Sequence, residues 1–221
     1  MSELSSSDTG LRERKRRQTA DHIAATAFRL FEAQGYEPVT MEQIASESDV
    51  SKGTLYNYFP VKEALVAHQF RVEIATGMAD LGHALRQQPT FAARMTVLLR
   101  ASAEWNKGRR AYLPHYLRFR WTNTSLGTGR SVPDEYSSGT FRILEALFRE
   151  GQKAGEVRSD LTAKHLAMSF ELLLAGAISV WLDHPEMDLV QNFENALELL
   201  LHGAATVAPA TSARPSRHKK K

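Results

Sequence analysis

The sequence contains no cysteine among its 221 residues. This absence excludes disulfide bonds, cysteine-ligated metal sites and thiol nucleophiles. Long hydrophobic runs are also lacking, because Glu171 interrupts the most apolar stretch, residues 166–181, and His165 and Asp183 border it. We therefore predict no membrane span. The polar, serine-rich residues 1–10 lack the apolar core of a secretion signal. We expect a cytoplasmic protein that binds no membrane.

Catalytic motifs are missing as well. The sequence has no glycine-rich phosphate loop after a strand, no pair of histidines at zinc-binding spacing and no nucleophile elbow. We therefore expect no enzymatic activity, no cofactor and no metal ion. Polar His and Arg residues in the second half of the chain keep a helical enzyme as the least favoured alternative.

Positive charge is concentrated near the two ends of the chain, although the net charge is only +3. Residues 1–17 are predicted to form a basic disordered arm and residues 207–221 a basic disordered tail. Basic arms often lie along nucleic-acid phosphates, and they also serve as solvated, solubilising extensions. For each end of the chain, contact with nucleic acid and a solvated extension both remain possible interpretations of the sequence. The arm carries five basic residues: Arg12, Arg14, Lys15, Arg16 and Arg17.

What the sequence does contain is helical periodicity. Apolar residues recur at the spacing of a helix, and no run alternates like a strand. We predict an all-α protein with an N-terminal three-helix helix-turn-helix domain at residues 18–65 and a larger helical domain at residues 66–206. Expected helices in the larger domain span residues 90–107, 109–121, 134–154, 162–183 and 188–205, with Pro114 kinking or starting the second and a polar loop at 123–133.

Residues 40–59 have the features of a helix-turn-helix motif. Thr40 and Gln43 form a capping box, and Ser51 caps the second short helix. The small Ala45 allows the two helices to cross closely, and the chain reverses at residues 48–50. A short helix with outward polar side chains fits the DNA major groove.

This segment resembles the tetracycline-repressor-like (TetR) family of bacterial regulators from about residue 19 to residue 70. Most of the match is carried by the run Ser-Lys-Gly-Thr-Leu-Tyr-Asn-Tyr-Phe at 51–59, with further matches at 27–31, 35–36, 40–45 and 62–65. The chain departs from the family pattern at Asp49, where Gly is common and a left-handed backbone is expected, and at Val61, which cannot cap a helix.

The resemblance implies roles for individual residues. Phosphate contacts fall on Thr40, Lys52, Tyr56, Tyr58 and Lys62. Gly53 would let the backbone approach DNA, and Thr54 and Asn57 would read bases. Tyr56 and Tyr58 can instead be core aromatics. Arg14, Arg16 and Arg17 would contact the minor groove or the backbone.

In the family, the larger domain binds a small molecule and dimerises. The resemblance therefore implies a site for a small apolar or aromatic effector, and the aromatic and polar candidates are Trp105, Tyr112, His115, Tyr116, Phe119, Phe141, Phe148 and Phe170. Plain core packing is the alternative for each of them. A constitutive DNA-binding protein without an effector is the alternative for the whole chain.

Residues 162–205 carry two apolar stripes, one at positions 166, 170, 173, 174, 177 and 181 and one at positions 189, 193, 196, 197 and 200. We predict that they form a homodimer through a four-helix bundle, which would suit a near-palindromic DNA operator. Packing within one chain is the alternative. The predicted function is a repressor released from its operator by the effector, with the helix at about 60–84 acting as the lever between the two domains.

Overall fold

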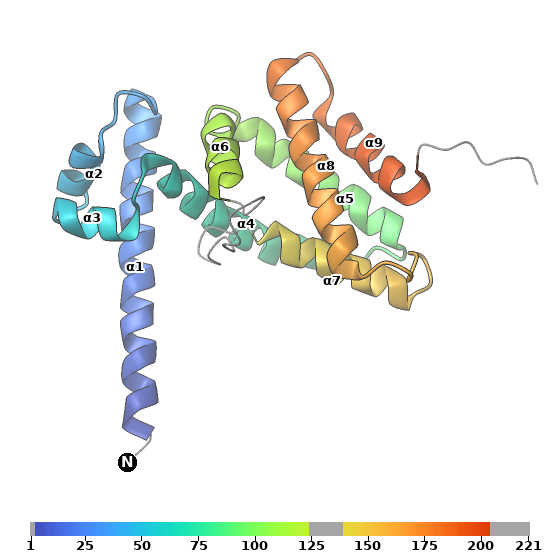
Figure 1. The fold of residues 1–221 in the computed structure, drawn as a ribbon, viewed down its shortest axis with the longest axis horizontal. Coiled ribbons are helices and arrows are strands. Elements are labelled where there is room, and N and C mark those ends of the chain that lie inside the picture. The colour runs from blue at the N-terminus through green and yellow to red at the C-terminus, as the bar shows by residue number, and fades with distance from the viewer. Residues whose placement is uncertain (1–2, 124–138, 204–221) are drawn as a thin grey trace, which may run out of the picture.

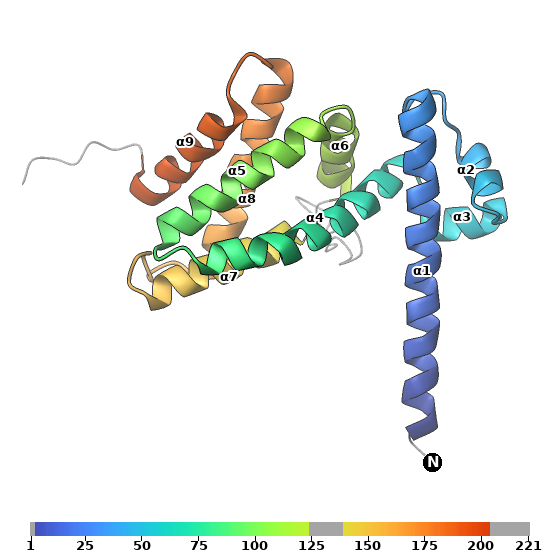
Figure 2. The same cartoon turned by 180° about the vertical axis from the view of Figure 1, so that it is seen from behind.

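The computed structural model describes residues 3–123 and 139–203, and within these ranges every regular element is an α-helix. This confirms the all-α prediction. A head formed by α1–α3 is joined through α4 to a body formed by α4–α9 (Figure 1, Figure 2). The helices are α1 (Glu3–Gln34), α2 (Met41–Glu47), α3 (Lys52–Tyr58), α4 (Lys62–Arg86), α5 (Phe91–Gly108), α6 (Leu113–Asn123), α7 (Thr140–Lys153), α8 (Ala163–Asp183) and α9 (Leu189–His202).

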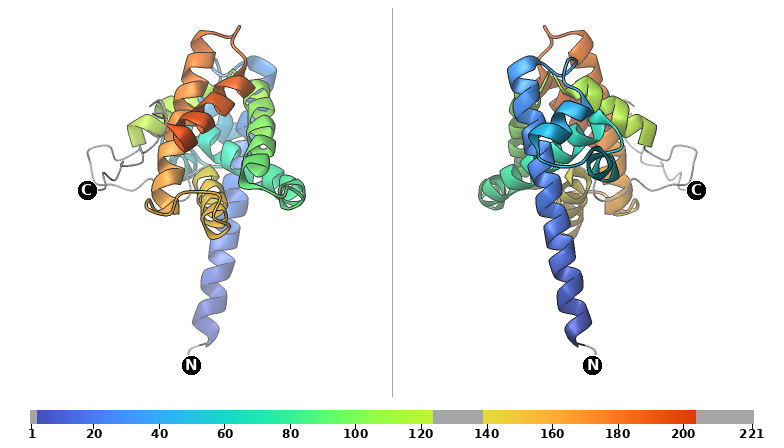
Figure 3. Two further views of the ribbon diagram at one scale, coloured as in Figure 1. Left: turned by 90° about the vertical axis from the view of Figure 1, so that its right-hand side faces the viewer. Right: turned by 90° about the vertical axis from the view of Figure 1, so that its left-hand side faces the viewer.

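Helix α1 extends far beyond the helices that it packs against, and its N-terminal part projects away from the molecule (Figure 3). The disordered state expected for residues 1–17 is therefore wrong from Glu3 onward. Residues 11–18 contain mostly Arg, Lys, Leu, Glu and Gln, which are good helix formers. Because a packed helix is already nucleated, each added residue gains one backbone hydrogen bond without a new nucleation cost. The tail at 207–221 lies outside the described residues.

The head is held together by a small core in which α1 packs against α2 and α4 and α2 packs against α3. The side chains of Ile23, Phe31, Ile44 and Leu55 are buried there, as the helical periodicity predicted. The predicted caps are also present: Thr40 Oγ1 accepts from the Gln43 amide at 3.1 Å, and Ser51 Oγ accepts from the Thr54 amide at 3.1 Å.

Two turns of the head depend on a left-handed backbone. Gly35 ends α1 with φ of 86°, and Asp49 adopts φ of 53° between α2 and α3. The left-handed backbone at Asp49 was predicted from the sequence. Asp can occupy this region at a modest cost, so the turn forms without the glycine that is common there. Val61 provides no side-chain cap for α4, also as predicted.

In the body, α8 packs against both α7 and α9, and α5 packs against α4, α7 and α9. Pro114 lies in the first turn of α6, so it starts this helix rather than kinking it. The helix predicted from residue 134 is described from Thr140, and the predicted loop at 123–133 falls almost entirely outside the described residues.

The two stripes assigned to a dimer interface are mostly buried within one chain, which corrects that assignment. Helices α8 and α9 pack their stripes against each other and against the rest of the body, and the buried members are Leu166, Phe170, Leu174, Trp181, Leu189, Phe193, Ala196 and Leu197. A different face of α8 remains exposed, with Met168, Leu172 and Val180 each 45–49% accessible. By length and composition α8 could also cross a membrane, contrary to our expectation, but core helices pass the same test.

Candidate DNA-binding surface and ligand cavity

The outer face of α3 is polar, and its inner face is apolar. Leu55 and the following Phe59 are buried in the head, whereas Lys52, Tyr56 and Asn57 are exposed. This division follows from the helical period, since positions 53 and 57 lie one turn apart on the side opposite Leu55 and positions 52 and 56 flank them. Three of the predicted DNA contacts therefore share one accessible surface.

Gly53 lies on the same exposed face. A Cβ atom added to Gly53 would meet only Ser51 Oγ, at 3.9 Å, and the backbone of Gly53 has no left-handed conformation. Nothing within the described head therefore requires glycine at this position. This open space leaves room for another molecule to approach the backbone of α3 closely at Gly53.

Two further predicted contacts have internal partners. Thr54 Oγ1 lies 2.8 Å from Ser51 Oγ, and Thr40 Oγ1 is used as the cap of α2. Lys52 Nζ lies 3.5 Å from Glu42 Oε1, but both side chains are at least half exposed. An exposed pair of this kind is weak, so the ammonium group can exchange this carboxylate for a phosphate.

Lys62 has a structural role. Its Nζ donates to three backbone carbonyls, those of Tyr36 at 2.7 Å, Glu37 at 3.2 Å and Val39 at 3.0 Å, and lies 4.2 Å from the centre of the Tyr36 ring. An ammonium group has three protons, so none is left for a phosphate. The geometry therefore counts against the predicted phosphate contact. Tyr58 is half-buried beside Phe59, between the two roles considered for it.

The basic residues of the N-terminal extension are exposed along α1, including Arg14, Arg16 and Arg17. They place positive charge along the direction in which α1 projects (Figure 3). Because they stand on a helix, their relative positions are fixed, in contrast to those on a disordered arm.

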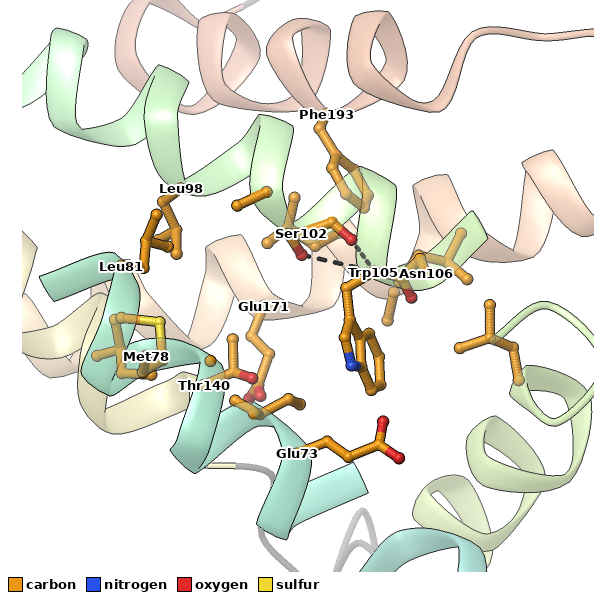
Figure 4. A pocket seen from close by; sticks show the side chains of 18 of the residues that line it. Glu73, Met78, Leu81, Leu98, Ser102, Trp105, Asn106, Thr140, Glu171 and Phe193 are labelled. Atoms are coloured by element: carbon orange, nitrogen blue, oxygen red, sulfur yellow. Dashed lines mark hydrogen bonds between the residues drawn. The ribbon is translucent and has the colours of Figure 1, made fainter. Parts of the chain in front are cut away.

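The body contains a partly open cavity of about 520 Å³ between α4, α5, α6, α7, α8 and α9 (Figure 4). Its wall is largely apolar, and helix α4 contributes a row at helical spacing that includes Ile74, Met78 and Leu81. We did not assign α4 to a ligand site from the sequence, although its apolar positions at 74, 78, 81 and 85 could have indicated a second buried stripe. The cavity has the size and the composition of a small-molecule site.

Only two of the eight predicted ligand-site residues, Trp105 and Tyr116, line this cavity. Tyr112 packs on Phe28 of α1, with ring centres 5.1 Å apart. The remaining predictions lie elsewhere: His115 at the head, Phe148 and Phe170 against each other in the core, Phe119 buried outside the lining, and Phe141 packed against the core. Sequence periodicity locates apolar faces but does not say which of them face a void.

Few polar groups reach the cavity, and most are paired. Arg120 and Glu171 form an ion pair at 3.2 Å, and Glu73 binds Arg109 through both carboxylate oxygens at 2.8 and 3.1 Å. Burial works against the charge of Arg120, but Tyr116 and Glu171 raise its pKa, so it stays protonated. Trp105 Nε1 is buried and has no hydrogen-bond partner within the described residues.

Known proteins resemble both the helix-turn-helix head and the chain as a whole. The family model for bacterial regulatory proteins of the tetR family matches residues 23–68, which contain the packed part of α1, α2, α3 and the start of α4. The HTH-type transcriptional regulator TcmR of Streptomyces glaucescens is 48% identical over 54 residues, 24% of either chain. The fatty acid metabolism regulator protein of Bacillus subtilis is 22% identical over 183 residues, 82% of this chain and 93% of that protein.

Solved structures resemble the whole described chain. The structure of FadR from Thermus thermophilus, a TetR-family transcriptional repressor in complex with lauroyl-CoA, has a TM-score of 0.73 at 22% identity and covers 90% of this chain and 100% of its own. FadR from Bacillus subtilis in complex with stearoyl-CoA has a TM-score of 0.57 at 19% identity, covering 83% and 98%. At these identities the likeness establishes the fold. Together with the helix-turn-helix geometry of the head, the match over residues 23–68 shows that the head is a DNA-binding domain of the kind found in bacterial regulatory proteins of the tetR family.

Proposed function

We propose that this protein is a cytoplasmic, homodimeric repressor that binds a near-palindromic DNA operator and leaves it when an elongated apolar molecule fills the cavity. The observation that carries the proposal is the cavity of about 520 Å³ in the body of a chain whose head presents an exposed α3. A body without such a cavity would favour the alternative of a constitutive DNA-binding protein.

For the effector we propose a fatty acyl thioester. An acyl chain suits a long apolar wall, and the buried Trp105 N–H needs an acceptor, which a thioester carbonyl oxygen would provide. Among the described residues that line the cavity, Arg120 is the one cation, and it is already paired with Glu171. The carboxylate of a free fatty acid would therefore find no free counter-charge among them. Lauroyl-CoA and stearoyl-CoA are the molecules named with the two FadR structures.

For DNA we propose that Lys52, Tyr56 and Thr40 contact phosphates and that Asn57 and Thr54 face base edges, with Tyr58 at the rim of this surface. Gly53 would allow the backbone to approach the duplex. The support is their common exposure on or beside α3 and the open space around Gly53. Arg14, Arg16 and Arg17 would follow the phosphates along the direction of α1.

For the dimer we propose that the exposed face of α8 is the centre of the interface within residues 162–205. Met168, Leu172, Gly176 and Val180 recur every four residues and form one exposed row. Three of these side chains are large and apolar, and Gly176 lets a partner helix come close. Pairing α8 and α9 with those of a second chain would cover the row in a four-helix bundle.

The effector proposal is tested by titrating lauroyl-CoA into the protein bound to a duplex that it has selected from a random pool. Release of the DNA and quenching of Trp105 fluorescence are expected together, whereas coenzyme A alone should cause neither. The variant Ala101→Trp fills the cavity and should block the quenching, and Ala92→Trp, on the exposed side of α5, is its matched control. Unchanged binding of lauroyl-CoA to Ala101→Trp would contradict the proposed site.

The DNA proposal is tested on the same duplex. Asn57→Ala should relax the preference at one base position by about 1–3 kcal/mol. Gly53→Ala should leave thermal stability intact, since open space surrounds this position, and still weaken DNA binding. If Gly53→Ala bound DNA as tightly as the wild type, the close approach at α3 would be refuted.

A further inference from the structure

Helix α6 carries two functional faces. Leu113, Tyr116, Leu117 and Arg120 line the cavity, at the spacing of one side of a helix. His115 and Arg118 point toward the head and the start of α4 instead, where they contact Tyr36 and Glu63. One rigid turn of helix therefore connects the wall of the cavity to the head.

The contact between His115 and Tyr36 is a ring stack. The ring centres are 3.8 Å apart and the planes are inclined by 25°. The His115 side chain is 18% exposed and Tyr36 is 9% exposed, so water is largely excluded from the contact. Burial, followed by the charges of Arg118 and Lys62, lowers the pKa of His115 below its usual value, and Glu37 and Glu63 oppose this shift. The imidazole is thus neutral at neutral pH.

Tyr36 belongs to the segment that positions α2. It directly follows the left-handed Gly35 at the end of α1, and four residues later Thr40 caps α2. Lys62 binds the carbonyls of Tyr36, Glu37 and Val39, so this segment moves as one unit with the start of α4. A displacement of Tyr36 therefore reaches the helix-turn-helix at its first residue.

The stacked arrangement leaves one group of Tyr36 in an unfavourable environment. Its hydroxyl group is buried without a hydrogen-bond partner in the described part of the chain. A buried unpaired hydroxyl is unfavourable, and it would recover a hydrogen bond if α6 moved away and water entered. Packing thus favours the closed arrangement while hydrogen bonding favours an open one, which is the balance that a two-state element needs.

We propose that His115 is the positioning residue that transmits occupancy of the cavity to the helix-turn-helix, through its stack on Tyr36. An effector that displaces the Leu113–Tyr116–Leu117 face of α6 separates His115 from Tyr36 and releases the α1–α2 connection. This inference rests on the proposed function, because it requires that the cavity takes an effector. It differs from transmission along α4, the route expected from the sequence.

The experiment measures the ratio of DNA affinities without and with saturating lauroyl-CoA, for the full-length protein on its selected duplex. An allosteric ratio of roughly 5–150 is typical for such coupling. His115→Ala should reduce the ratio to about 1–2 while lauroyl-CoA still quenches Trp105, because the cavity is intact but disconnected. His115→Phe restores a ring for the stack and should keep most of the wild-type ratio.

Arg118→Gln is the matched control. It lies on the same side of α6 and removes the ion pair with Glu63 of α4, but it leaves the stack on Tyr36 in place. The ratio should therefore survive in Arg118→Gln. A wild-type ratio in His115→Ala, or equal loss in both variants, would overturn the role of His115, because the signal would then pass through α4 or through general loosening of α6.

The cavity filler separates this inference from the effector class. If lauroyl-CoA neither binds nor releases DNA but Ala101→Trp lowers DNA affinity, and His115→Ala reverses that loss, the acyl thioester is wrong and the role of His115 stands. If neither lauroyl-CoA nor Ala101→Trp changes DNA affinity, the proposed function fails and the inference fails with it. If lauroyl-CoA and Ala101→Trp each change DNA affinity as strongly in the His115→Ala variant as in the protein with His115, only the inference fails.

Discussion

The cores of the head and of the body of this protein are packed differently. The head is small and closed, with the side chains of Ile23, Ile44 and Leu55 fully buried around one centre. The body is larger, surrounds a cavity of about 520 Å³ and leaves apolar side chains half exposed on α8. A closed core holds one conformation, whereas a core that borders a void can be repacked by a ligand. The exposed face of α3 therefore lies on the head, whose closed core has less freedom to repack than the core of the body.

The largest expected effect comes from placing a charge on the exposed row of α8 or, for comparison, in the buried contact between α8 and α9. Leu172→Glu places a charge on the exposed row of α8 and should give folded monomers. Leu197→Glu buries an unpaired charge inside one chain, at 5% exposure, and should unfold the body, since such a charge costs about 3–5 kcal/mol. Light scattering and circular dichroism distinguish the two results. A folded dimer for Leu172→Glu would place the interface elsewhere.

The contrast between the two cores can be measured directly. Leu55→Ala removes a fully buried side chain from the head and should destabilise it by about 2–5 kcal/mol. Ile178→Ala shortens a half-buried residue that already borders the cavity and should cost less, because the new space merges with an existing void. Urea unfolding of both variants checks this. Equal losses would mean that the cavity wall is as tightly supported as the head.

A smaller effect separates two lysines of the head that were predicted to act alike. Lys62→Ala removes three charge-assisted hydrogen bonds from the α1–α2 connection and should lower the melting temperature. Lys52→Ala should leave stability nearly unchanged and flatten the salt dependence of DNA binding by about one charge. Melting curves and salt titrations test the pair. Unchanged stability of Lys62→Ala would restore Lys62 as a candidate phosphate contact.

The smallest expected effect is a pH dependence at the junction of head and body. The pKa of His115 is lowered in the folded chain, chiefly by burial, so below about pH 6.5 the unfolded chain binds more protons than the folded one. Stability should fall as the pH drops from 6.5 toward the lowered folded value, and it should be unaffected by His115 above 6.5. The groups facing the ring are Tyr36, Glu37, Lys62, Glu63 and Arg118. His115→Phe should remove this part of the profile, and an identical profile would exclude His115 as its source.

The predictability of the head and of the body from sequence also differs, for a physical reason. The turns at Gly35 and Asp49 and the cap at Thr40 involve only residues that are close in the sequence, so the local sequence predicts them directly. The internal partners of Lys62 were not predicted, because they lie 23–26 residues away in the sequence and the local pattern gives no sign of them.

In the body, the apolar residues of α8 surround most of the helix, so periodicity alone does not tell a face that packs inward from one that meets a partner. The stripe through Phe170 and Leu174 proved internal, while Leu172 lies exposed. The cavity was misplaced for a similar reason. Phe148 and Phe170 pack against each other in the core, whereas Trp105 and Tyr116 border the cavity, and only the three-dimensional packing distinguishes the two pairs.

The long α1 gives the head a mechanical property as well as a charge. The same continuous helix contains the buried Ile23 and the exposed Arg12, which are eleven residues apart. A tilt of about 10° at Ile23 would sweep Arg12 through roughly 3 Å, because eleven helical residues span roughly 16 Å. That travel is as long as the hydrogen bond between a guanidinium and a phosphate. The extension thus acts as a lever arm that amplifies a small rotation of the head core into a larger displacement at its tip.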